Sequence, residues 1–318
     1  MNFQQQTTRR QSLLAIAGSA VGATTVAVAP RLAAIEPFNR PGPPRLQLSL
    51  AAYSFRKFFG WMRGKIQQPA DPDRALSMSS FITLAADLGF DAAELTSYFF
   101  NPAILDQGLS ELRRQAFLRG IGLSGTAVGN NFALAKAADR EREIADVKRW
   151  IDRAAVLGIP HIRVFAGPVP RELAPNEAQR LCIESLEVCA AYAGTRGVML
   201  GLENHGGLVT TADQLLEIVR AVKSEWFGVN LDTGNFHSDD IYNDLARCAP
   251  YAVNVQYKVE IRRQKGGEAE PADPHRVIAL LRNAGYQGFL ALEYEAAEDP
   301  YLAVPKHLDK LREALGGS

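Results

Sequence analysis

Three apolar segments in the second half of the chain run into an acidic residue, and a fourth ends in an amide and an amine. These polar residues are Glu203, Asp232, Glu293, Gln256 and Lys258. Three carboxylates that meet at one place repel one another unless a positive charge lies between them. Carboxylate and amide oxygens are ligands that hard cations prefer. The set of Glu203, Asp232, Gln256 and Glu293 therefore predicts one bound divalent metal ion, with Mn²⁺ or Mg²⁺ favoured and Co²⁺ or Zn²⁺ possible.

Short apolar segments that precede such polar residues are typical of strands buried on both faces, as in a parallel sheet. We expect eight of them, and amphipathic stretches separate them. The expected strands are Leu46–Tyr53, Phe90–Thr96, Leu123–Ala127, Ile162–Ala166, the apolar part of Gly197–His205, Phe227–Leu231, Ala252–Lys258 and Phe289–Leu292. The expected helices lie near Ala75–Leu88, Ile104–Arg119, Asp139–Leu157, Asn176–Gly194, Thr211–Val222, Asp239–Cys248, Asp273–Asn283 and the last stretch to about Leu315.

Eight strand–helix units in a row predict one closed (β/α)8 barrel. The chain has 318 residues, of which 47% are hydrophobic, and a barrel of this kind needs roughly 250 residues. No GxGxxG follows the first strand and no phosphate-binding loop is present, which disfavours a doubly wound nucleotide-binding fold. In a barrel, the carboxyl ends of all strands meet at one mouth, so the polar residues above are expected to converge there.

The overall charge excludes some partners. Lys and Arg total 35, as do Asp and Glu, so the formal net charge is zero. Such a chain has no basic field for nucleic acid, and we expect none as a partner. The three cysteines do not make a disulfide framework and are predicted to be buried thiols.

The first thirty residues differ in composition from the rest. Arg9 and Arg10 precede an apolar run, Leu13–Ala29, and this arrangement resembles a twin-arginine export signal. We therefore predict a signal peptide over 1–30, a Pro-rich linker over 31–45 and the catalytic barrel over 46–318. The protein is expected to be exported to the periplasm, without stable membrane insertion once the signal is removed.

Three motifs carry a wider resemblance. LENHGG at Leu202–Gly207, LDTGN at Leu231–Asn235 and LEYE at Leu292–Glu295 resemble those of the sugar phosphate isomerase/epimerase superfamily, whose members have xylose isomerase-like barrels. The resemblance covers nearly everything from residue 46 to 315. It implies that Glu203, Asp232 and Glu293 bind one divalent metal and that the two Glu form an acid/base pair. The superfamily places a His where this chain has Gln256, which would bind the metal through its carbonyl oxygen.

Further residues in the same motifs are candidates for sugar binding. His205, Asn235, His237 and Lys258 are predicted to contact substrate oxygens. A second group is expected to shape the pocket or to hold the carboxylates, and it consists of Asn204, Asn130, Arg163, Glu94, Tyr53, Phe55 and Trp61. His161 and His307 are predicted to be surface or core residues, and Glu295 and Glu260 to be loop residues outside the site.

A carboxylate pair suits proton transfer next to a carbonyl, through an enediolate that a metal stabilises. We therefore expect an isomerase or epimerase of a sugar or keto-sugar, with the same groups able to eliminate a leaving group from a 3-keto-glycoside as the alternative. A barrel that binds sugar without turning it over is the second alternative. An endonuclease IV-type activity is disfavoured, because the second and third expected strands offer no histidines. A homo-oligomer is possible.

Overall fold

The computed structural model describes residues 35–316, and eight of its strands form a closed parallel barrel in the ring order β1-β12-β9-β8-β7-β6-β5-β4. Every neighbouring pair in the ring is parallel. The barrel strands are β1 (Arg45–Ala51), β4 (Ala92–Glu94), β5 (Gly122–Ala127), β6 (His161–Val164), β7 (Met199–Glu203), β8 (Phe227–Asp232), β9 (Ala252–Tyr257) and β12 (Gln287–Leu292). This closure confirms the predicted single (β/α)8 barrel.

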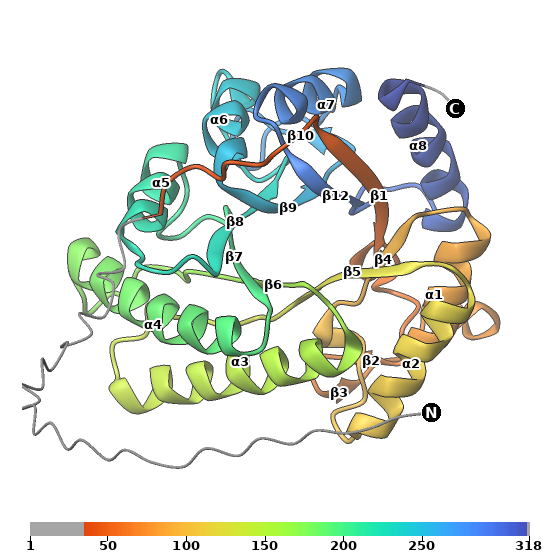
Figure 1. Ribbon diagram of the computed structural model, residues 1–318, viewed down its shortest axis with the longest axis horizontal. Helices are drawn as coiled ribbons and strands as arrows, with labels where there is room; N and C mark the ends of the chain where they lie inside the picture. The colour runs from red at the N-terminus through yellow and green to blue at the C-terminus, as the bar shows by residue number, and fades with distance from the viewer. Residues whose placement is uncertain (1–34, 317–318) are drawn as a thin grey trace, which may run out of the picture. The chain divides into compact units, whose positions relative to one another are not determined.

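Within residues 35–316, the helices α1 to α8 lie outside the ring of strands, as Figure 1 shows. They are α1 (Met78–Asp87), α2 (Asp106–Leu118), α3 (Ala137–Leu157), α4 (Pro175–Thr195), α5 (Ala212–Ala221), α6 (Ile241–Cys248), α7 (Pro274–Asn283) and α8 (Pro300–Leu315). The expected start of α5 is confirmed, because the Thr211 hydroxyl accepts a hydrogen bond from the backbone N–H of Gln214. Pro274 likewise lies in the first turn of α7, where its missing N–H costs nothing. None of the helices within residues 35–316 combines the length and the apolar character that a membrane crossing requires.

Two of the connections between strands and helices contain short hairpins, which the sequence did not predict. One hairpin consists of β2 (Trp61–Met62) and β3 (Lys65–Ile66), and the other of β10 (Glu260–Ile261) and β11 (Glu270–Pro271). Both hairpins follow the carboxyl ends of barrel strands, β1 and β9. They therefore lie on the face of the barrel where the mouth opens.

His161 occupies the barrel interior at the start of β6 and is 3% exposed. Burial lowers the pKa of this imidazole to about 3, so it is neutral. Two neighbouring strands supply glycines beside it: an added Cβ would lie 2.9 Å from Nδ1 at Gly125 and 2.7 Å from Nε2 at Gly201. The glycines thus make room for the ring. Of the two positions predicted for His161, surface or core, the structure shows the core.

The segment before β1 packs on the opposite, amino-terminal end of the barrel. The Gln287 amide donates to the carbonyls of Pro41 and Pro43 at 2.8 and 3.0 Å, and the backbone N–H of Phe38 donates to Pro250 at 3.0 Å. The predicted signal peptide and residues 31–34 of the predicted linker lie outside the described residues. The three cysteines, Cys182, Cys189 and Cys248, are buried free thiols, as predicted.

Candidate active site

A small cavity of about 70 Å³ lies at the carboxyl-terminal mouth of the barrel. Its lining combines carboxylates, cations and aromatic rings from at least five strand ends. The lining residues are Tyr53, Arg63, Tyr98, Arg163, Phe165, Glu203, His205, Asn235, Lys258, Glu293 and Glu295. The structure thus brings Glu203, His205, Asn235, Lys258 and Glu293 together, as the convergence of barrel strand ends requires.

Glu203 ends β7 and is held through both of its carboxylate oxygens. Arg163 Nε lies 2.8 Å from Oε2, and the Asn235 amide donates to Oε1 at 2.9 Å. The Nε–H bond of Arg163 is not directed at the oxygen, so this contact is an ion pair rather than an aligned hydrogen bond. Burial raises the pKa of Glu203 to about 7, against the lowering effect of Arg163. Near neutral pH the residue can therefore both hold and release a proton.

Lys258 follows β9 and lies among three carboxylates. Its Nζ is 3.5 Å from Asp232 Oδ2 and 3.2 Å from Glu293 Oε1, and it also pairs with Glu295. Burial raises the pKa of both Asp232 and Glu293, while the Lys258 charge acts in the opposite direction. Glu295, which was predicted to lie outside the site, is instead one of the groups that hold Lys258.

The Asp232 backbone is fixed by the neighbouring strand end. Asn204 donates from Nδ2 to the Asp232 carbonyl at 2.9 Å and accepts the Asp232 N–H at Oδ1 at 2.8 Å. The carboxylate accepts the backbone N–H of Gly234 at Oδ1, whereas Oδ2 is buried and makes no hydrogen bond within residues 35–316. Asn204 therefore positions Asp232 and leaves Oδ2 facing the Lys258 ammonium.

Gln256 belongs to a closed ring of hydrogen bonds inside the barrel. We call this set the amide ring, and its members are Glu94, Asn230, Asn254 and Gln256. Gln256 donates to Glu94 at 3.0 Å and accepts from Asn230 at 2.7 Å. Asn254 donates to Asn230 at 2.9 Å and to Glu94 at 3.1 Å, which closes the ring. All four side chains are at most 2% exposed, so the ring joins β4 to β8 and β9 across the interior.

The xylose isomerase-like TIM barrel family matches residues 82–314, which is most of the chain. The chain belongs to this family. No curated protein sequence matches it. The superfamily resemblance of the three motifs is thereby confirmed at the level of the family.

Solved structures that resemble the chain include enzymes that act on sugars. D-psicose 3-epimerase from Clostridium cellulolyticum H10, solved with D-tagatose, has 19% identity and a TM-score of 0.66, covering 85% of this chain and 99% of its own. A 3-keto-D-glucoside 4-epimerase from E. coli has 16% identity and a TM-score of 0.64, covering 85% and 99%. A xylose isomerase-like TIM barrel protein from Mycobacterium smegmatis, in complex with magnesium, has 19% identity and a TM-score of 0.63, covering 85% and 98%. At these identities the likeness shows the fold.

The four residues predicted to bind a metal in this xylose isomerase-like barrel are not arranged as a ligand set. Residues 35–316 contain no group of three or more His, Cys, Asp or Glu side chains placed to hold a metal ion. The carbonyl oxygen of Gln256 already accepts the Asn230 amide, and its nitrogen binds Glu94. Lys258 Nζ lies between Asp232 and Glu293, where a metal that both carboxylates bind would also lie. The residues as placed do not fit a divalent ion.

Of the other residues predicted to bind substrate or to shape the pocket, some line the cavity and others do not. His205 is exposed at the cavity, with its ring 4.2 Å from that of Phe165. His237 instead hydrogen-bonds the carbonyl of Arg262, which directly follows β10, at 2.8 Å. Asn130 braces Phe165 through two backbone hydrogen bonds, of 2.8 and 2.9 Å. These two side chains support loops rather than line the cavity.

Arg63 lines the cavity, although the sequence did not predict it there. It lies at the tip of the β2–β3 hairpin with a φ of 51°, and its guanidinium stacks on Tyr98 at 4.3 Å. A hairpin of two-residue strands leaves almost no periodic signal, so its tip could not be placed over the mouth from sequence.

Proposed function

We propose that the chain isomerises or epimerises a sugar that carries a carbonyl group, with Glu203 and Glu293 as the acid/base pair. The observation that carries this proposal is the pair itself. Both carboxyl groups are buried and line one small polar cavity, where Glu203 ends β7 and Glu293 directly follows β12. Two strands, β8 and β9, separate them in the ring, so they approach a bound molecule from different sides. The sugar epimerases among the similar structures support the same class of reaction.

The reaction needs one carboxylate and one carboxylic acid. The ionised group removes the proton from the carbon next to the carbonyl. The C–H electron pair forms a C=C bond, and the carbonyl π pair moves onto oxygen. The second group then gives a proton back to carbon. Return to the same carbon on its opposite face is epimerisation. Return to the former carbonyl carbon is isomerisation, in which the hydroxyl proton of the first carbon also moves to the neighbouring oxygen, so that the carbonyl changes place. Because burial raises the pKa of both groups toward neutrality, the two protonation states can coexist there.

The remaining side chains of the cavity orient the pair. Arg163 and Asn235 fix the two oxygens of Glu203, and Lys258 holds Glu293. Tyr98 stabilises Arg163 in turn, because the Arg163 Nη1 group lies 3.3 Å from its hydroxyl. A proton can therefore be exchanged with substrate without a search for the correct side-chain rotamer.

The test is incorporation of deuterium from D₂O into a panel of ketohexoses, ketopentoses and 3-keto-glucosides, followed by NMR. We expect incorporation at one carbon next to the carbonyl, and a loss of at least about 100-fold in the Glu203→Gln and Glu293→Gln variants. Glu184→Gln, at an exposed position of α4, is the matched control and should retain the full rate. Binding of a sugar without exchange would identify a binding barrel rather than an enzyme, and equal exchange in Glu203→Gln would exclude that residue as the base.

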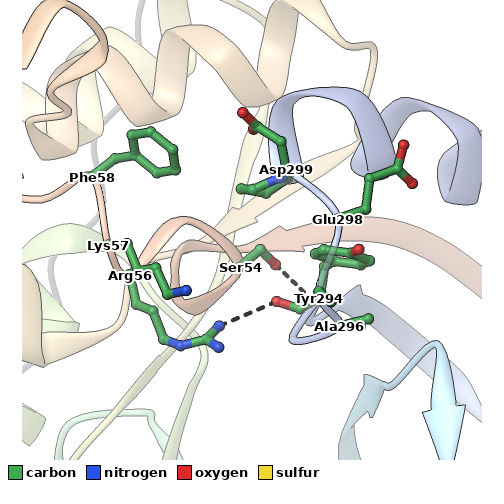
Figure 2. A pocket seen from close by; sticks show the side chains of 10 residues that line it. Ser54, Arg56, Lys57, Phe58, Tyr294, Ala296, Glu298 and Asp299 are labelled. Carbon is green, nitrogen blue, oxygen red and sulfur yellow. Dashed lines mark hydrogen bonds between the residues drawn. The ribbon is translucent and has the colours of Figure 1, made fainter. Parts of the chain in front are cut away.

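Elimination from a 3-keto-glycoside is the second candidate reaction, and a neighbouring cavity favours it. This cavity, of about 250 Å³, lies between the end of β1 and the start of α8, and Figure 2 shows Ser54 and Arg56 hydrogen-bonded to Tyr294 within it. Arg56 also pairs at 4.0 Å with Glu295, which lines the small cavity at the mouth of the barrel. The second cavity offers room for a leaving group beside the reacting sugar. Release of a free alcohol or phenol from a 3-keto-glucoside would establish this reaction, whereas a rearranged sugar with its aglycone retained would exclude it.

We further propose export through the twin-arginine route, on the strength of Arg9, Arg10 and the apolar run that follows. The test is fractionation of cells that express the full chain. Replacing both arginines with lysine should move the protein from the periplasm to the cytoplasm. The same distribution of the wild-type chain and the variant would contradict this route.

The domain boundaries and a homo-oligomer remain predictions. Size-exclusion chromatography with light scattering tests the oligomeric state.

A further inference from the structure

Fixed cations occupy the positions at which the carboxylates of this site need positive charge. Lys258 Nζ lies 3.5 Å from Asp232 Oδ2 and 3.2 Å from Glu293 Oε1, and it pairs with Glu295 as well. The Lys258 side chain is 11% exposed, and that of Asp232 is fully buried. A compact ammonium in contact with three carboxylates supplies the positive charge that three converging carboxylates require, and for which the sequence predicted a divalent ion.

Glu203, the third predicted metal ligand among the acids, has a cation of its own. Arg163 Nε lies 2.8 Å from Glu203 Oε2, and both side chains are at most 6% exposed. The guanidinium is itself held by the Val128 carbonyl at 3.1 Å and stacks on Phe165 at 4.0 Å. Arg163 cannot lose its charge at any pH at which the protein is folded, so the pair persists whenever Glu203 is ionised.

Gln256, the fourth predicted ligand, is committed elsewhere. Its amide closes the amide ring, with the oxygen on Asn230 and the nitrogen on Glu94. To offer its oxygen to a metal at the mouth, the side chain would have to leave two buried partners without their hydrogen bonds. The cost of such orphaned groups opposes that movement.

We propose that this site works without a bound divalent metal and that the Lys258 ammonium supplies the charge that stabilises the enediolate. This inference rests on the proposed function. When the proton leaves the carbon next to the carbonyl, the electron pair ends on the carbonyl oxygen, and that oxygen lies against Lys258 Nζ. The return of a proton to carbon restores the carbonyl, so no oxidant, reductant or further reactant is consumed. Lys258 is thereby a catalytic residue, and the ligand chemistry it selects is an oxygen that becomes anionic during the reaction.

Whether the site binds a divalent metal can be tested without a substrate. The full chain is treated with a chelator, analysed for Mn, Mg, Co and Zn, and titrated with Mn²⁺ while the free ion is followed by electron paramagnetic resonance. We expect no stoichiometric metal in the purified chain and no Mn²⁺ site tighter than about 1 mM, far weaker than a built metal site. One Mn²⁺ bound per chain at micromolar concentration, and lost in Asp232→Asn, would overturn the proposal.

The role of Lys258 is tested on the exchange reaction. Lys258→Met should lower the rate of deuterium incorporation by about 100-fold or more, while Lys258→Arg, which keeps the charge and guards against misfolding, should retain a larger part of it. Chelator should leave the wild-type rate unchanged. An unchanged rate in Lys258→Met, or a rate that Mn²⁺ restores after chelation, would refute the role of Lys258. If no sugar exchanges at all, the proposed function fails, and the Mn²⁺ titration still decides which cation the site holds.

Discussion

Arg163 forms a buried ion pair with Glu203. Replacing Arg163 with Met should therefore destabilise the protein more at high pH than at low pH. In the wild type, Glu203 has a pKa of about 7 with Arg163 beside it. Arg163→Met removes the charge that lowers this pKa, so Glu203 stays protonated to higher pH in the folded variant. Below pH 7 the carboxyl is protonated in both proteins, and the ion pair contributes little to the difference between them.

The expected loss of unfolding free energy in Arg163→Met has two parts. Loss of the contacts to Tyr98, Val128 and Phe165 removes about 2 kcal/mol at every pH. At pH 8.5 the variant must in addition hold a proton that the wild type releases. The assay pH of 8.5 lies about 1.5 units above the wild-type pKa of Glu203. At 1.36 kcal/mol per pKa unit, holding this proton costs the variant about 2 kcal/mol of unfolding free energy. The total of about 4 kcal/mol falls in the range of about 3–5 kcal/mol typical of a broken buried pair.

Urea unfolding at pH 5.5 and 8.5 measures both parts. The variant should lose about 2 kcal/mol of unfolding free energy at pH 5.5 and about 4 kcal/mol at pH 8.5. In a Glu203→Gln background the difference between the two pH values should vanish. Arg180→Met, which breaks the exposed ion pairs of Arg180 with Glu177 and Glu184 on α4, is the matched control and should change stability by less than about 1 kcal/mol. An Arg163→Met loss of the same size at both pH values would refute the reasoning.

Three further outcomes are expected. First, the raised pKa of Glu203 means that the folded state holds a proton that the unfolded state releases. Its contribution to stability is therefore full below pH 4.5 and decreases by about 3 kcal/mol as the pH rises to about 7. Urea unfolding of Glu203→Gln across that range should show a slope that is smaller by this amount, and the raised pKa values of Asp232 and Glu293 should account for part of the slope that remains. Second, Gly201→Ala should destabilise by about 1–3 kcal/mol, because the added methyl would lie 2.7 Å from His161 Nε2. Gly60→Ala meets nothing within 4 Å, and similar melting temperatures for the two variants would contradict the packing argument. Third, Gln256→Leu should cost about 1–3 kcal/mol by leaving a buried amide donor without its acceptor, and an unchanged unfolding midpoint would show that the ring is not closed in solution.

The fold was predictable from the sequence because most barrel strands contain a short, largely apolar run with a turn or helix signal on either side. The ends of the strands were less certain. The expected strand at Phe90–Thr96 pairs only over Ala92–Glu94, because the chain turns at Ser97–Phe99 into a short 3₁₀ helix. Hydrophobic pattern cannot distinguish a buried residue in a strand from one just beyond it.

Most of the residues that line the site could also be predicted from the sequence, whereas the contacts between them could not. The position of Lys258 two residues after Gln256 put both near the mouth, but the sequence could not show which one faces the carboxylates. That choice depends on Asn230 and Asn254, which lie within strands and point into the barrel, where polar residues are not expected. Glu295 was excluded because it lies beyond β12, yet the long side chain of Lys258 reaches it.

The amide ring limits the order in which this sequence can change. Each of its four members satisfies buried partners on other strands, so replacing one alone leaves polar groups without hydrogen bonds. Each such loss costs about 1–3 kcal/mol, out of the roughly 5–15 kcal/mol that keeps a domain folded. A lineage that exchanged Gln256 for an imidazole would pass through a weakened ancestor unless a partner on another strand had changed first. Selection for folding alone, with no reference to catalysis, is therefore expected to hold the amide at position 256 in place.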